Sequence, residues 1–335
     1  HFNQLISKFN NDTQLQKATF LRLVINSFFQ NFSLHFLNEF SIDNFYMIAG
    51  RSLTVGYSRT FEKYLFAELS NSSNKNNKSI NEILTQRFIK RIDVIKEVFE
   101  KVTGKGSLKK LMSLIKHTDT TKHTLNAILE KANFILKGKY ELDGDSEYLL
   151  LNGLDEKYVL LKNASTGQQE VIRVLQDLFL STMNEKYCSR VIEEPEAHLF
   201  PEAQKLLVEI FARFVNNLKT EPGFNQMNSI IITTHSPYIL TAYNNLLFAN
   251  RVIQKNEALK AEVLDIIDEH CLLDSKDFSA YGLKIVQNEG DVYCRSIVDT
   301  ETGLIDQNFL DSVSDTLNAE FQALYALHTK TFARK

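Results

Sequence analysis

Apolar runs of strand length alternate with helical patterns through the second half of the chain. Residues 189–194 (SRVIEE) and 229–235 (SIIITTH) have the strand pattern. Helical spacing of apolar residues is found in 170–183, in 201–218, which opens with Pro201, and in the shorter stretch 236–246. Apolar strands separated by helices are typical of a parallel sheet with helices on its faces. The pattern therefore predicts an α/β fold built on a parallel sheet.

The first half of the chain has a different pattern of apolar and polar residues. Residues 15–40 have helical spacing and 44–50 (NFYMIAG) form a short strand pattern, before the Asn-rich polar loop 70–79. The pattern is again helical over 80–136, and the stretch 139–163, interrupted at Asp-Gly and Asn-Gly, predicts a β-meander. We expect four units: 1–57, the first part of the α/β head; 58–136, a helical lobe; 137–253, the core; and 254–335, a C-terminal α/β extension.

Composition narrows the class of protein. A net charge of −3 over 335 residues excludes a uniform basic coat for nucleic acid. Six lysines against one acid in 101–123 form either a solvated helix face or a phosphate-contacting patch. No stretch is apolar enough to span a membrane, and three widely spaced cysteines indicate buried thiols in a reducing compartment. We therefore expect a cytoplasmic protein.

Polar residues follow the predicted strands and precede one helix. The turn 163–170 (NASTGQQE) opens a helix, where Ser165 or Thr166 is either an N-cap or part of an anion site. Glu193 and Glu194 end one strand, and His235 ends the next. One acid can join a Mg²⁺ shell while its neighbour activates a water, although a solvated loop also explains the pair.

In this order, the three motifs resemble ABC-type ATPases, in particular the soluble SMC/OLD-like group, which have a P-loop NTPase fold. ASTGQ resembles the signature motif, VIEEPEAHLFPEAQ the Walker B motif and D-loop, and IIITTHS the switch histidine. MIAGRS (47–52) and TGLIDQNFLDSVSDTL in the tail resemble stretches of ATP-binding proteins of the same group.

The resemblance implies a role for each matched residue. Ser165, Thr166, Gly167 and Gln168 would form the signature turn that contacts an ATP held by a partner subunit. A second set of residues would serve the chain's own ATP: Glu193 in the Mg²⁺ shell, Glu194 polarising the attacking water, His235 on the γ-phosphate, and His198, beside Ala197 in the D-loop, reaching across the dimer.

The resemblance also implies a homodimer closed around ATP and Mg²⁺, acting in DNA-related or anti-phage defence processes. DNA and an effector nuclease are candidate partners. Two alternatives stay open, a non-hydrolysing scaffold that recruits an effector nuclease and a nuclease in its own right. The family's P-loop, GxxxxGK[ST], is absent, because TGKGSLKK (103–110) has the wrong order and is interpreted as a turn. We expect the P-loop in a preceding segment and this chain alone to be inactive.

Overall fold

The computed structural model describes residues 43–56, 80–100, 106–114, 117–153, 157–184, 188–217, 228–283, 294–306 and 318–329. The helical prediction for 15–40 and the polar loop 70–79 lie outside these residues.

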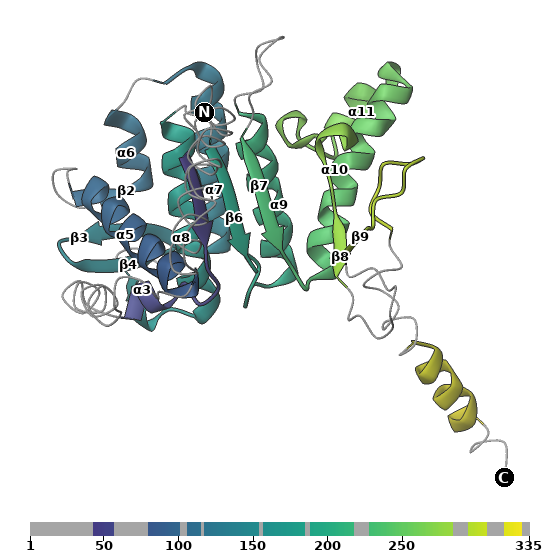
Figure 1. Cartoon of the computed structure of the whole chain (residues 1–335), viewed down its shortest axis with the longest axis horizontal. Helices are drawn as coiled ribbons and strands as arrows, with labels where there is room; N and C mark the ends of the chain where they lie inside the picture. The colour runs from purple at the N-terminus through teal and green to yellow at the C-terminus, as the bar shows by residue number, and fades with distance from the viewer. Residues whose placement is uncertain are drawn as a thin grey trace, which may run out of the picture.

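A parallel sheet lies at the centre of the molecule (Figure 1). Its strands are β1 (Asp43–Met47), β6 (Cys188–Glu193) and β7 (Ser229–Thr233), in the order β1-β6-β7. Ile192 at the end of β6 is aligned with Met47 of β1 and with Ile232 of β7, and both Met47 and Ile192 are fully buried. The predicted α/β fold with a parallel sheet is therefore confirmed.

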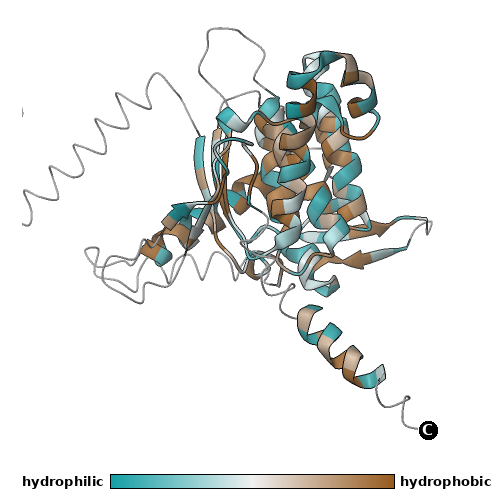
Figure 2. Cartoon of the chain, turned by 90° about the vertical axis from the view of Figure 1, so that its right-hand side faces the viewer, coloured by the Kyte–Doolittle hydropathy of each residue, from teal (hydrophilic) through white to brown (hydrophobic). Residues whose placement is uncertain are grey.

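Long helices pack beside this sheet. They are α7 (Asp119–Ile135), α8 (Thr166–Met183), α9 (Pro201–Asn216) and α10 (Pro237–Lys255). Helix α7 packs on α8 and α9, and α10 packs on α9. Figure 2 shows long helices stacked on one side of the central strands. Helix α10 runs nine residues past the predicted end at residue 246, because buried residues such as Leu247 and Ile253 continue its apolar face.

The predicted β-meander is present and has one more strand than expected. Strands β2 (Gly106–Ser107), β3 (Gly138–Asp143), β4 (Ser146–Leu151) and β5 (Tyr158–Leu160) form an antiparallel sheet in that order. The interpretation of 103–110 as a turn is wrong for the described residues 106–110. Gly106 and Ser107 pair with β3, and residues 108–110 begin helix α6 (Leu108–Leu114). A Cβ at Gly106 would lie 2.6 Å from the carbonyl oxygen of Phe99, so only glycine fits this close approach.

The remaining helices and the tail complete the described chain. They are α3 (Leu53–Gly56), α5 (Ile80–Glu100), α6 (Leu108–Leu114), α11 (Lys260–Leu264), the hairpin β8 (Tyr281–Leu283) and β9 (Cys294–Ser296), the 3₁₀ turns η1 (Leu161–Asn163), η2 (Glu257–Leu259), η3 (Glu269–Cys271) and η4 (Ser275–Asp277), and a helix over 318–329. Strand β2 and helix α7 join the helical region to the meander and the core, and the four-unit division stays a prediction. None of the described helices is long and apolar enough to cross a membrane.

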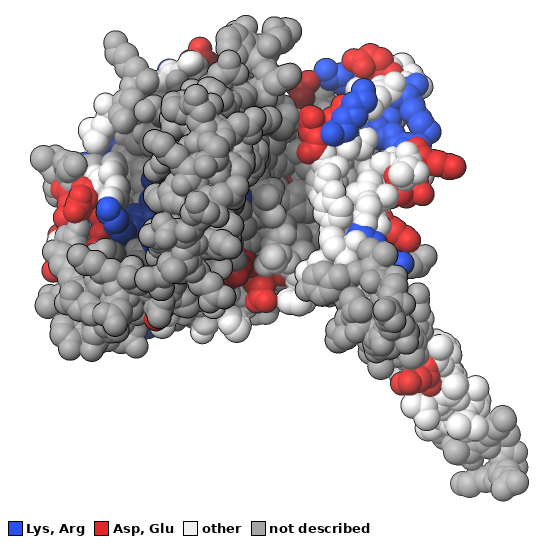
Figure 3. All heavy atoms as spheres, in the orientation of Figure 1, with Lys and Arg blue, Asp and Glu red and all other residues white. Residues whose placement is uncertain are grey.

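Of the expectations for charge and cysteines, only the burial of Cys294 is contradicted in the described residues. Figure 3 shows basic and acidic side chains interspersed over the α10–α11 end of the molecule. Lys122 pairs with Asp119 at 3.2 Å, and both side chains are exposed, as on a solvated helix face. Cys188 and Cys271 are buried as predicted, but Cys294 is exposed because it lies on the short β8–β9 hairpin.

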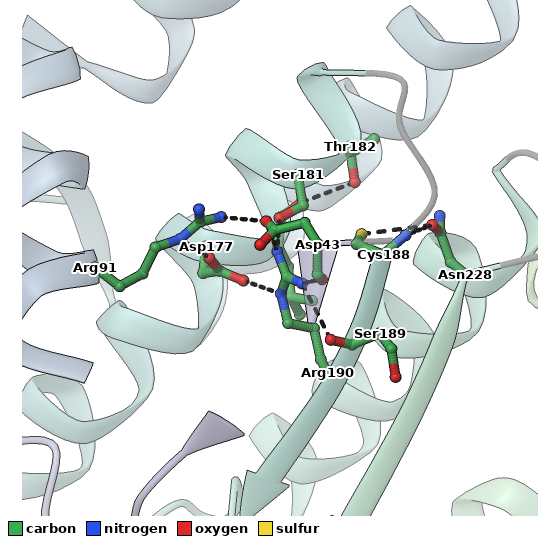
Figure 4. A network of polar contacts seen from close by, with 10 residues as sticks. Asp43, Arg91, Asp177, Ser181, Thr182, Cys188, Ser189, Arg190 and Asn228 are labelled. Atoms are coloured by element: carbon green, nitrogen blue, oxygen red, sulfur yellow. Dashed lines mark hydrogen bonds and ion pairs between the residues drawn. The ribbon is translucent and has the colours of Figure 1, made fainter. Parts of the chain in front are cut away.

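A buried ion network fixes the amino-terminal ends of β1 and β6 (Figure 4). The fully buried Arg190 of β6 donates to Asp177 of α8 at 2.5 Å and to Asp43 of β1 at 2.9 Å. Arg91 of α5 binds the same two carboxylates at 2.8 and 3.1 Å. Because each buried charge is paired, the attraction between the charges offsets the cost of removing them from water, and the network links two strands and two helices.

Candidate functional site

The carboxyl ends of β6 and β7 meet at one edge of the sheet, where we name residues 193–199 the carboxylate loop. The amide of Glu194 donates to the carbonyl of Thr233 at 3.0 Å, which holds the loop to the end of β7. Glu194 has φ 40° and His198 φ 62°, in the left-handed region that costs non-glycine residues energy. The surrounding contacts must therefore impose this backbone shape.

Two of the predicted site residues come together at this edge. His235 Nε2 lies 3.4 Å from Glu194 Oε1, and the two residues follow the ends of the adjacent strands β7 and β6. The His235 side chain is 89% exposed and that of Glu194 is 43% exposed. Both groups are thus open to a ligand arriving from solvent.

Glu193 is held more firmly than its neighbour. Its Oε2 accepts from the amide of Ala49 at 2.8 Å, and its Oε1 accepts from the hydroxyl of Tyr46. The hydrogen bond to Glu193 raises the pKa of Tyr46 to about 12, with burial adding to the effect. Strand β1 and the turn after it therefore fix the direction of the Glu193 carboxylate.

The turn of residues 165–168, which we name the Ser165 turn, begins helix α8. The Ser165 hydroxyl accepts from the amide of Gln168, and the Gln168 side chain accepts from the amide of Ser165, so the turn is a capping box. The predicted N-cap is confirmed, and it leaves Ser165 and Thr166 exposed. Gln168 also donates to the carbonyl of Leu136 at 2.6 Å.

The Ser165 turn touches the carboxylate loop through backbone packing. A Cβ built on Gly167 would lie 2.5 Å from the carbonyl oxygen of His198, so a side chain at this position would push the two segments apart. The side chain of His198 itself is exposed. The structure thus joins the candidate signature segment to the loop that bears Glu193 and Glu194.

Arg51 is a residue of this site to which the sequence assigned no role. Its guanidinium donates to the carbonyls of Glu193 at 2.6 Å and Glu194 at 3.0 Å and pairs with Glu170 of α8 at 3.4 Å. Burial lowers the pKa of Arg51, while the negative charges of Glu170 and of the loop carboxylates act in the opposite direction. Glu170, Glu193 and Glu194 are more than a hundred residues away from Arg51 in the chain, so no local sequence pattern predicts these contacts.

Glu196 is a second such residue. One carboxylate oxygen accepts from the Thr234 hydroxyl at 2.5 Å and from the amide of His235 at 3.2 Å. The side chain is buried, and Oε2 has no hydrogen-bond partner among the described residues. Glu196 therefore fixes the backbone from which His235 projects.

The donor set of this edge suits a nucleotide with Mg²⁺. Within the described residues no group of three or more His, Cys, Asp or Glu side chains is arranged to hold a metal ion by itself. Mg²⁺ in nucleotide sites is bound by one or two carboxylates together with phosphates and waters. Glu193, oriented by Tyr46 and Ala49, would be the carboxylate for such an ion, and the exposed His235 would be the donor to a phosphate.

Comparison with known proteins places the chain in a family. Residues 2–240 match the AAA ATPase domain family, and the chain belongs to that family. The match covers the strand β1, the Ser165 turn, the carboxylate loop and His235. The general class predicted from the sequence, an ATP-binding ATPase with a P-loop NTPase α/β fold, is therefore confirmed.

A solved structure adds a distant likeness. It is the Smc head domain with an extended coiled coil bound to the C-terminal domain of ScpA, derived from Pyrococcus furiosus. It shares 12% sequence identity with the chain, at a TM-score of 0.25. The alignment covers 55% of the chain and 44% of that structure, so the chain spans less than half of its length. No curated protein matches the chain.

Proposed function

We propose that the chain acts as an ABC-type ATPase head of the SMC/OLD-like group, which binds ATP with Mg²⁺ and hydrolyses it within a homodimer. The observation that carries this proposal is the pairing of Glu194 with His235. Their side chains lie 3.4 Å apart and are open to solvent at the edge where two parallel strands end. Open α/β sheets bind ligands at the carboxyl ends of their strands.

Each residue of this edge has a distinct task. Glu194 orients the attacking water and accepts its proton, for which its half-exposed carboxylate is available. His235 donates a hydrogen bond to the terminal phosphate and is sensitive to its loss. Glu193 offers its oxygens to the cation, which supplies charge neutralisation of the phosphates when bound.

The Ser165 turn serves the nucleotide of a second copy of the chain. The start of α8 presents a positive dipole and backbone amides, and Ser165 and Thr166 are exposed there. Two chains arranged head-to-tail would each complete the other's site, with His198 close to the junction. Hydrolysis would then open the dimer and move attached elements or partners.

The wider role follows from the same resemblance. A cytoplasmic function in DNA-related or anti-phage processes, with DNA or an effector nuclease as partner, fits an ATP-driven dimer. The four-unit division belongs to the same proposal.

Trapping of the closed dimer tests this function. Glu194→Gln in the full-length protein should bind ATP without turnover and accumulate as a dimer in light scattering, whereas wild type should return to monomer as ATP is consumed. Adding Ser165→Arg to that variant should abolish the trapped dimer, because a bulky cation would block the exposed turn. A Glu194→Gln protein that stays monomeric with ATP, or a dimer unaffected by Ser165→Arg, would contradict the shared-site arrangement.

A further inference from the structure

We propose that Arg51 is a positioning residue that joins the helix of the Ser165 turn to the carboxylate loop, so that the two ends of the shared ATPase site move together. This inference rests on the proposed function. It concerns a residue outside the three motifs, and it follows from the contacts of one fully buried guanidinium.

Arg51 holds both peptide groups that flank the Cα of Glu194. One guanidinium nitrogen donates to the carbonyl of Glu193 at 2.6 Å, and another donates to the carbonyl of Glu194 at 3.0 Å. Glu194 has the strained φ of 40°, which needs outside support to persist. The direction of the Glu194 side chain is therefore set in part by Arg51.

The same guanidinium is fixed to helix α8. Arg51 Nε donates to the backbone carbonyl of Glu170 at 3.2 Å and pairs with its carboxylate at 3.4 Å. That carboxylate also accepts from the amides of Arg51 at 2.7 Å and Ser52 at 3.0 Å. Arg51 and Glu170 are 0% and 4% exposed, so water does not compete for these contacts.

Glu170 lies one helical turn after Gly167, whose backbone packs directly on the carbonyl of His198. Helix α8 thus meets the carboxylate loop at two points, one through Gly167 and one through Glu170 and Arg51. A displacement of the Ser165 turn by a partner's nucleotide must be transmitted to the loop or must break these contacts.

Lysine cannot replace arginine in this role. The guanidinium spreads its donors over a rigid fork and reaches four backbone carbonyls and one carboxylate, while an ammonium is a single point on a flexible stem. Arg51→Lys keeps the buried charge but loses the fork. The backbone of Glu194 should then lose the support that orients its side chain.

The test compares two buried arginines in the full-length protein. Arg190→Lys is the matched control, since Arg190 is also fully buried and paired but lies at the opposite end of β6, in the network of Figure 4. We expect both variants to lower Tm. Arg51→Lys should also lower kcat for ATP about 10- to 100-fold with KM changed less than about threefold, because misplacement of a reacting group acts on the chemical step. Arg190→Lys should keep kcat within about twofold of wild type.

Equal kcat losses in the two variants would overturn the inference. If Arg51→Lys does not fold, Glu170→Gln tests the inference instead, because it keeps the side-chain shape and weakens the contact between Arg51 and helix α8. Glu170→Gln should lower kcat about 3- to 10-fold, and an unchanged kcat would again overturn the inference. Absence of ATP hydrolysis by wild type would instead refute the proposed function, so the two failures are distinguishable.

Discussion

Gly167→Ala perturbs the contact between the Ser165 turn and the carboxylate loop with a single methyl group. The new Cβ would lie 2.5 Å from the carbonyl oxygen of His198, and ordinary contact begins at 3.4 Å. The two segments must therefore separate by about 0.9 Å, the difference between these distances. Because His198 is already in the left-handed region, its backbone has little freedom to yield.

The cost to stability is small. Overpacking of this kind costs about 1–3 kcal/mol, and alanine recovers up to about 1 kcal/mol over glycine inside a helix. The net loss should be about 0–3 kcal/mol, and each kcal/mol lowers Tm by about 1–2 °C in a chain of 335 residues. Turnover should fall more, about 10- to 100-fold, because the loop that bears Glu194 moves with His198.

Gly106→Ala supplies the matched control. A Cβ there would meet the carbonyl oxygen of Phe99 at 2.6 Å, in the β-meander, with no helix to offset the strain. Thermal unfolding and phosphate release should show that Gly106→Ala is at least as unstable as Gly167→Ala yet hydrolyses ATP at a rate near wild type. Equal turnover in the two variants would refute the reasoning that the contact between the turn and the loop has a functional role.

Two further predictions concern buried carboxylates. Burial raises the pKa of Glu147, but Arg173 outweighs it and holds that pKa at about 2. The resulting contribution to the free energy of unfolding, about 3 kcal/mol, is complete above pH 4.5 and is lost as the pH falls towards 2. Urea unfolding should show this loss in wild type and not in Glu147→Gln. Equal dependence of the unfolding free energy on pH in the two proteins would contradict the prediction. Glu196→Gln keeps the acceptor for Thr234 and His235 and should retain turnover. Glu196→Ala leaves both donors unpaired, so it should lower the free energy of unfolding by about 1–3 kcal/mol and lower turnover. Equal stability and turnover in the two variants would argue against the role of Glu196 in holding the backbone of His235.

The sequence predicted the elements whose signal is local. Strands β6 and β7 are apolar runs that end in polar residues, and Ser165 stands three residues before Gln168, as a capping box requires. The parallel sheet followed from these local patterns. The contact of Glu194 with His235 was not predicted, but it agrees with their positions, since parallel strands end at the same edge. Residues 15–40 gave an equally clear helical pattern, which lies outside the described residues.

The parts that were missed depend on long-range contacts. Arg51 forms hydrogen bonds with Glu170, 119 residues away in the chain, and with Glu194, 143 residues away. Arg190 forms one with Asp43, 147 residues away. No periodicity encodes such partners. Gly106 and Ser107 form a strand only because β3 lies beside them, a tertiary effect that overrides the local preference for a turn.

Turnover of Glu194→Gln is the measurement that tests the central claim most directly. The account holds that Glu194, placed 3.4 Å from His235, accepts the proton of the attacking water. Phosphate release by the full-length variant should fall about 10²- to 10⁴-fold while ATP binding is retained, and the exposed Glu202→Gln on α9 should hydrolyse ATP as wild type does. Turnover of Glu194→Gln within about threefold of wild type would contradict the account.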